Sequence, residues 1–149
     1  MAAEPEYALA TLGEVLLTPT RIYARALLAA RASLLAAAHD FRGIAHVTGG
    51  GLPGNVPRAL PEGLGARLDP VRWRMPSVMR LIGALGGLGD DEIRATFNGG
   101  LGMVVVVAPS AMDATLTALR DAGLDAAIVG EVVATDRLGG ARYAEGAIA

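Results

Sequence analysis

The sequence contains no cysteine and no lysine, and only 4% of its residues are aromatic. Without cysteine, the chain has no disulfide bonds, no thiolate nucleophile and no cysteine-ligated zinc. Because all 13 Lys+Arg residues are arginine, a phosphate-gripping P-loop lysine, a Schiff-base lysine and a kinase-type lysine are also absent. The two histidines, His39 and His46, are too few for an all-histidine metal site. These absences exclude several common catalytic mechanisms.

Long hydrophobic runs and an excess of charge are missing as well. The formal net charge is −2 and the sequence pI is about 5.6, which argues against nucleic-acid or polybasic membrane binding. The most apolar stretch, residues 22–38, is interrupted by Arg25, Arg31 and Ser33, whereas a spanning helix needs about 20 apolar residues. The first six residues lack the basic start of a signal peptide. We therefore expect a cytoplasmic protein that binds neither nucleic acid nor membrane.

The order of predicted elements indicates one α+β domain over residues 11–149, after a disordered end at residues 1–10. Thr18-Pro19-Thr20 favours a helix start, because Thr is a good N-cap and Pro suits the first helical position; this helix should end near residue 38. Strands are predicted at residues 44–48, 65–69, 102–107, 126–133 and 141–148, and further helices at 55–60, 76–87, 90–95 and 110–122. This irregular alternation is typical of a mixed sheet covered by helices.

The first candidate site is the triplet Gly49, Gly50 and Gly51, which follows the strand at 44–48 and precedes a helical turn. Bare backbone N–H groups beside a helix N-terminus suit an anion such as phosphate. The alternative is a flexible turn. Arg58, further along, could pair with a phosphate or simply face solvent. Residues 49–54 also fit G-x-G-x-x-G, but the segment before Pro61 is too short for the crossover helix of a dinucleotide-binding fold.

His46 and Thr48 precede these glycines and, because strand side chains alternate, should lie on one face and flank the loop. His46 is a candidate catalytic or substrate-binding residue, with a hydrogen-bonded structural histidine as the alternative. Asn98 lies in a second glycine-rich loop and offers an amide donor and acceptor. Thr20 and Arg21 are a third candidate pair. No complete catalytic constellation and no metal site is evident.

Several motifs recur together in order and carry a resemblance. They are Leu12-Gly13-Glu14, residues 16–23 (LLTPTRIY), residues 45–52 (AHVTGGGL), residues 55–58 (NVPR), residues 60–63 (LPEG) and residues 96–103 (TFNGGLGM), with Trp73 between them. In order and spacing, residues 12–133 resemble the C-terminal domain of the aminoimidazole ribonucleotide synthetase family, also called phosphoribosylformylglycinamidine cyclo-ligase. The resemblance implies a three-layer α/β/α fold with a mixed sheet and a partial likeness to the ferredoxin fold.

The resemblance also implies an activity. The family closes the imidazole ring of formylglycinamidine ribonucleotide in purine biosynthesis, using ATP and Mg²⁺. ATP is thought to phosphorylate the formyl amide oxygen, after which an amidine nitrogen attacks and phosphate leaves. Carried onto this sequence, the resemblance makes His46 the catalytic candidate and assigns substrate binding to Thr20, Arg21, Thr48, Gly49, Gly50, Gly51 and Asn98.

The sequence departs from the family pattern at its beginning. The family has an N-terminal domain with acidic Mg²⁺ ligands and the ATP segment, and nothing here corresponds to it. We therefore expect this chain alone to bind no ATP or Mg²⁺ and to be inactive, with an ATP-binding N-terminal domain as its partner and a homodimer in the full enzyme. Alternative hypotheses are a non-catalytic interaction or regulatory module, one half of a split ATP-dependent enzyme of the same superfamily, or a kinase or selenophosphate-type relative.

Overall fold

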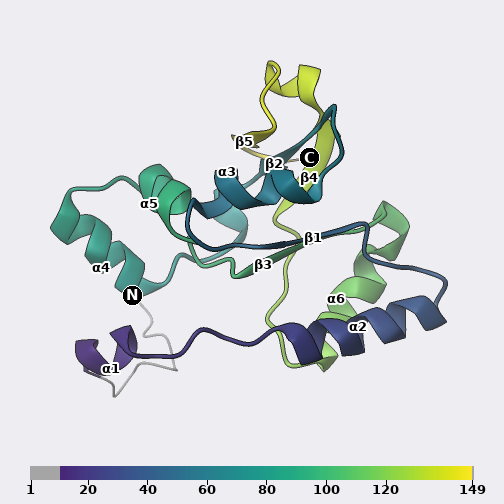
Figure 1. The fold of residues 1–149 in the computed structure, drawn as a ribbon, viewed down its shortest axis with the longest axis horizontal. Coiled ribbons are helices and arrows are strands. Elements are labelled where there is room, and N and C mark those ends of the chain that lie inside the picture. The colour runs from purple at the N-terminus through teal and green to yellow at the C-terminus, as the bar shows by residue number, and fades with distance from the viewer. Residues whose placement is uncertain (1–10, 149) are drawn as a thin grey trace.

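The computed structural model describes residues 11–148 (Figure 1), so the expected disorder of residues 1–10 lies outside the described residues. The elements, in chain order, are α1 (Leu12–Leu16), α2 (Ala24–Ala36), β1 (Gly43–His46), α3 (Gly51–Asn55), η2 (Val56–Ala59), β2 (Leu64–Leu68), η3 (Pro70–Arg72), α4 (Ser77–Gly86), α5 (Asp90–Thr96), β3 (Met103–Val106), η4 (Pro109–Ala111), α6 (Met112–Asp121), β4 (Gly130–Ala134), η5 (Thr135–Leu138) and β5 (Tyr143–Glu145). The predicted α+β class is confirmed.

The strands form two sheets. β1 and β3 make an antiparallel ribbon whose register runs from Gly43 opposite Val106 to His46 opposite Met103. The second sheet has β2 at its centre, antiparallel to β4 and parallel to β5. The predicted mixed sheet is therefore this three-stranded one. The β-branched run Val104–Val106 explains why β3 was predictable, since such side chains favour extended backbone.

Helices cover both faces of the β1–β3 ribbon, so this part of the molecule has three layers (Figure 1). On one face, Ala45 and its cross-strand partner Val104 pack with Leu52 and Val56 of α3 and η2, in a core that continues into β2. On the other face, Val105 packs against the core between α2 and α6. Burial of apolar side chains on both faces therefore holds the ribbon and its ends in place.

The predicted helix start at Thr18-Pro19 is wrong, because α2 begins at Ala24. The Thr18 hydroxyl instead donates to the Glu14 carbonyl oxygen at 3.2 Å, at the end of the short helix α1. That helix carries a capping box in which Thr11 and Glu14 bond reciprocally, a pattern visible in the sequence as T-x-x-E. Residues 18–23 therefore link two helices without being helical, and Thr20 and Arg21 lie outside any helical turn.

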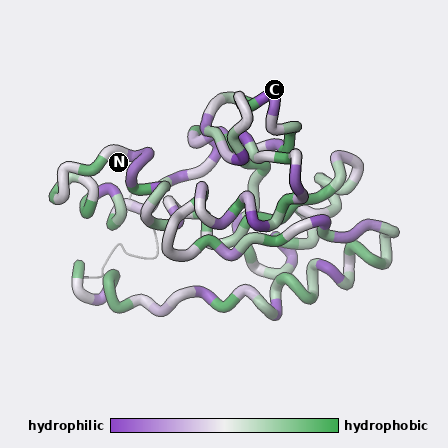
Figure 2. The backbone as a smooth tube through the Cα atoms, turned by 45° about the horizontal axis from the view of Figure 1, so that its top comes forward, coloured by the Kyte–Doolittle hydropathy of each residue, from purple (hydrophilic) through white to green (hydrophobic). Residues whose placement is uncertain are grey.

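Apolar side chains are not confined to the interior. Figure 2 shows hydrophobic segments along α1 and α2 as well as in the strands, and Ile22 and Leu28 are 85% and 68% exposed. α2 packs on one side only, through Ala30 and Leu34. No helix within residues 11–148 is long and apolar enough to span a membrane.

Candidate functional site

Two of the predicted segments, the one around Gly49–Gly51 and the one around Asn98, meet at one end of the β1–β3 ribbon, where β1 ends and β3 begins. The Val47 N–H donates to the Gly102 carbonyl oxygen at 3.0 Å, which extends the pairing beyond the strands. Val47 is buried, whereas His46 and Thr48 on either side of it are exposed. The alternation expected from strand geometry therefore holds, and both polar side chains face solvent at this end.

Tyr23 brings the segment before α2 to the same place. Its ring lies edge-on to the His46 ring, with centroids 6.1 Å apart. The absence of a side chain at Gly102 makes space for the Tyr23 ring, since a Cβ there would overlap the Tyr23 hydroxyl and lie 2.7 Å from the Tyr23 Cζ. Thr20 and Arg21 precede Tyr23 closely in the chain, so their segment leads to the site. Tyr23 ends the motif at residues 16–23, but its contact with His46 could not be predicted, because it joins residues far apart in the chain.

The glycine loop, residues Thr48–Gly51, is a turn held from beneath by Asn55. Gly50 and Gly51 have φ values of +88° and +59°, a region that glycine adopts without the Cβ penalty. The Gly51 N–H donates to the Thr48 carbonyl oxygen at 3.0 Å. The Asn55 amide, which is buried, donates to the carbonyl oxygens of Thr48, Gly49 and Gly51 at 3.4, 3.3 and 2.8 Å. Asn55 belongs to the motif at residues 55–58 (NVPR), but nothing in the sequence predicted this role for it.

The three glycines differ in what they can do. A Cβ at Gly51 would overlap the Arg94 carbonyl oxygen and lie 2.7 Å from the Phe97 carbonyl oxygen, so Gly51 allows α3 to touch the end of α5. Gly51 is buried and its N–H is already used. Gly49 and Gly50 are exposed, and no atom lies within 4 Å of a Cβ built at Gly49. Only these two glycines therefore present open backbone to a ligand.

The asparagine loop, residues Phe97–Gly102, lies next to the glycine loop through this Phe97–Gly51 contact. The Asn98 Oδ1 accepts from the Gly100 N–H at 2.9 Å, so the acceptor of this side chain shapes its own turn. The Trp73 indole N–H donates to the Gly99 carbonyl oxygen at 3.0 Å, which ties the loop to the segment before α4. The amide N–H₂ end of Asn98 and the second lone pair of its oxygen remain to reach a ligand.

Asp69, which follows β2, is engaged away from the site: it caps η3 by accepting from the Val71 N–H at 3.3 Å and pairs with Arg72. Arg58 is exposed in the last turn of η2. Beyond Trp73, an open depression of about 650 Å³ is lined by residues 70–75 with Arg80, Asp90 and Arg94, and it contains none of the predicted site residues.

Within residues 11–148, no group of three or more His, Asp or Glu side chains that could hold a metal ion comes together. What the site does offer is exposed glycine backbone, a hydroxyl, an imidazole and an amide at one edge. Backbone N–H groups and hydroxyls bind phosphate and sugar oxygens, and an imidazole can act as a general acid or base.

Comparison with known proteins agrees with this arrangement of motifs. The family described as AIR synthase related protein, C-terminal domain, matches residues 2–141. The chain belongs to this family. A phosphoribosylformylglycinamidine cyclo-ligase of Sorangium cellulosum is 52% identical over 124 residues, which cover 83% of this chain and 34% of that protein. Proteins of the same name from an Anaeromyxobacter species and Symbiobacterium thermophilum are 51% and 47% identical, covering 82% and 89% of this chain and 34% and 36% of theirs.

The chain therefore spans about a third of the length of the curated relatives it matches. The matched family covers both glycine-rich loops and Tyr23, so the whole ribbon end described above lies within it.

Proposed function

We propose that the chain is the substrate-side, C-terminal part of a phosphoribosylformylglycinamidine cyclo-ligase, which converts formylglycinamidine ribonucleotide and ATP to aminoimidazole ribonucleotide, ADP and phosphate. The convergence of the glycine loop, the asparagine loop and His46 at one ribbon end carries the proposal. The similarity of the chain to proteins named for this activity supports it. A structural turn alone would not need exposed His46, Thr48, Gly49 and Gly50 side by side.

In this proposal the ribose 5-phosphate end of the substrate lies against the glycine loop. The Gly49 and Gly50 N–H groups and the Thr48 hydroxyl donate to phosphate oxygens, which accept such bonds strongly because they are charged. The N–H₂ group of Asn98 donates to the substrate from the adjoining loop, and the segment of Thr20 and Arg21 closes the third side. His46 is exposed and can give or take a proton as the ring closes.

The triphosphate chemistry belongs, in this proposal, to an ATP-binding N-terminal domain and its Mg²⁺, in an enzyme that we expect to be a homodimer. ATP supplies the phosphoryl group that activates the formyl oxygen. Since residues 11–148 bring together no group of acidic or histidine side chains able to hold Mg²⁺, no step is assigned to a metal on this chain. The chain alone is expected not to hydrolyse ATP.

The experiment is calorimetric titration of ribose 5-phosphate, the part of the substrate that the loop would hold, into the chain and three variants. Gly49→Asp adds a negative charge where nothing lies within 4 Å, so the fold should persist while phosphate is repelled. Gly49→Asn has the same shape without the charge. Gly13→Asp adds the same charge at an equally open, exposed glycine in α1.

We expect Gly49→Asp to weaken binding at least tenfold, equivalent to about 1.4 kcal/mol. Gly49→Asn should stay within about threefold and Gly13→Asp should match the parent, since a screened charge elsewhere on the surface acts weakly. If Gly49→Asp binds ribose 5-phosphate as tightly as the parent, the glycine loop is not the phosphate site.

A further inference from the structure

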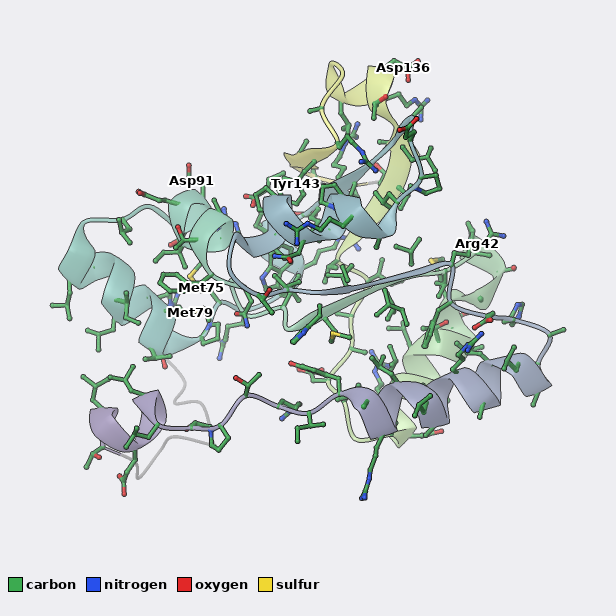
Figure 3. All side chains as sticks on the ribbon, viewed as in Figure 1. Arg42, Met75, Met79, Asp91, Asp136 and Tyr143 are labelled. Carbon is green, nitrogen blue, oxygen red and sulfur yellow. The ribbon has the colours of Figure 1, made fainter. Side chains whose placement is uncertain are left out.

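A cluster of ionisable side chains lies outside the site, between α5 and the end of β5. It consists of Arg94, Tyr143 and Glu145. Figure 3 shows Tyr143 at the part of β5 that faces α5 and α3. The cluster joins residues 51 positions apart in sequence.

The geometry of this cluster is tightly defined. The Arg94 Nε lies 2.9 Å from both Glu145 carboxylate oxygens, and its Nη2 donates to Oε2 at 2.6 Å. The Tyr143 hydroxyl donates to Glu145 Oε1 at 2.8 Å. The Arg94 and Glu145 side chains are only 11% and 22% exposed. Such forked pairing fixes both the distance and the orientation of the guanidinium.

The rest of Arg94 touches both loops of the candidate site. Its carbonyl oxygen occupies the space that a Cβ at Gly51 would need, and its Cγ lies 2.6 Å from where a Cβ at Gly99 would be. The backbone of one residue thus abuts the glycine loop while its side-chain stem abuts the asparagine loop. The guanidinium of the same residue is anchored on β5.

We propose that Arg94 and Glu145 are positioning residues: their ion pair anchors α5 on β5 and thereby sets the spacing between the glycine loop and the asparagine loop. The geometric part of this inference stands on the contacts alone, and its consequence for ligand affinity rests on the proposed function.

This ion pair is better suited to positioning the two loops than to stabilising the fold. Desolvating two charges offsets most of their attraction, so a nearly buried pair adds little net stability, whereas its directional bonds specify one arrangement. Burial, with the bond to Glu145 as the second cause, raises the pKa of Tyr143. The hydroxyl therefore stays protonated and remains a donor to Glu145 at neutral pH, which orients the carboxylate toward Arg94.

The test compares Glu145→Gln with Asp40→Asn. Asp40 forms an equally forked pair with Arg31, at 2.8 Å for both bonds, but that pair joins α2 to the segment before β1. For each variant the backbone amide resonances of Gly50, Gly51, Gly99 and Gly100 are recorded without ligand. The affinity for ribose 5-phosphate is then measured well below the melting temperature.

We expect Glu145→Gln to shift the loop resonances and to weaken ribose 5-phosphate binding at least fivefold, while Asp40→Asn does neither. A folded Glu145→Gln variant with parental loop resonances and parental affinity would overturn the proposal. If the parent itself does not bind ribose 5-phosphate, the proposed function fails, and the loop resonances alone decide the positioning role. If Glu145→Gln does not fold, Tyr143→Phe, which removes only the hydroxyl bond to Glu145, is judged by the same two outcomes.

Discussion

Replacing Gly51 by alanine should destabilise the protein by about 2–5 kcal/mol. A left-handed φ costs a non-glycine residue about 1–2 kcal/mol, and the φ of Gly51 is +59°. The added methyl group would also overlap the Arg94 carbonyl oxygen and lie 2.7 Å from the carbonyl carbon of Ala95 and the carbonyl oxygen of Phe97. These are backbone atoms that cannot rotate away, so overpacking adds about 1–3 kcal/mol.

The neighbouring glycines are matched controls. Gly50 shares the positive φ, +88°, but a Cβ there would meet only the Gly54 Cα at 3.8 Å, so Gly50→Ala should cost about 1–2 kcal/mol of strain alone. Gly49 has neither constraint, and Gly49→Ala should be neutral or stabilise by up to about 1 kcal/mol through the unfolded state.

Urea denaturation of the three variants gives the ranking directly, provided that the m-values stay equal. The structure predicts that stability falls in the order Gly49→Ala, Gly50→Ala, Gly51→Ala. If Gly51→Ala proves as stable as Gly49→Ala, then α3 does not contact α5 as described. The glycine loop and the asparagine loop would then not adjoin at this point.

Two further predictions concern the supports of the site. Asn55→Ala should lower the free energy of unfolding by about 1–3 kcal/mol in the same denaturation assay, because the buried Gly51 carbonyl oxygen loses a hydrogen-bond partner. The substitution removes the amide that donates to the Thr48, Gly49 and Gly51 carbonyl oxygens. Unchanged stability would mean that the turn does not depend on Asn55. For Tyr143, burial raises the pKa in the folded state, so the unfolded chain releases the proton first as pH rises above about 10. Stability should be complete below that pH and fall above it, by at most about 1.4 kcal/mol per unit and by less where solvent screens the half-buried hydroxyl. Tyr143→Phe should flatten this slope, and an identical slope in the variant would contradict the stated burial.

Elements with a strong local pattern could be predicted from the sequence. The run Val104–Val106 indicated β3, and Pro76 indicated the start of α4, which begins at Ser77. The start of α2 could not be predicted from the sequence, because Thr18 and Pro19 satisfy the local rules for a helix start. In the structure Thr18 instead bonds back to Glu14. The capping box of Thr11 and Glu14 was a usable signal for α1.

The candidate site was predictable to the level of motifs but not of geometry. The glycine and asparagine loops stood out as glycine-rich turns beside strands. Nothing local reveals that Gly51 serves contact with α5, whereas Gly49 stays open. Nor does the local sequence reveal the contact of Tyr23 with Gly102 or of Arg94 with Glu145, since tertiary packing between distant segments sets both contacts.

The central claim is that the two loops and His46 form one site for a phosphorylated ribose. Its most direct test is an amide and imidazole NMR titration of the chain with ribose 5-phosphate. We expect saturable shifts at Gly49, Gly50, Asn98 and the His46 ring, all with one dissociation constant. Shifts confined to the depression lined by Arg72, Arg74 and Arg80, with the loops and His46 unmoved, would contradict the claim.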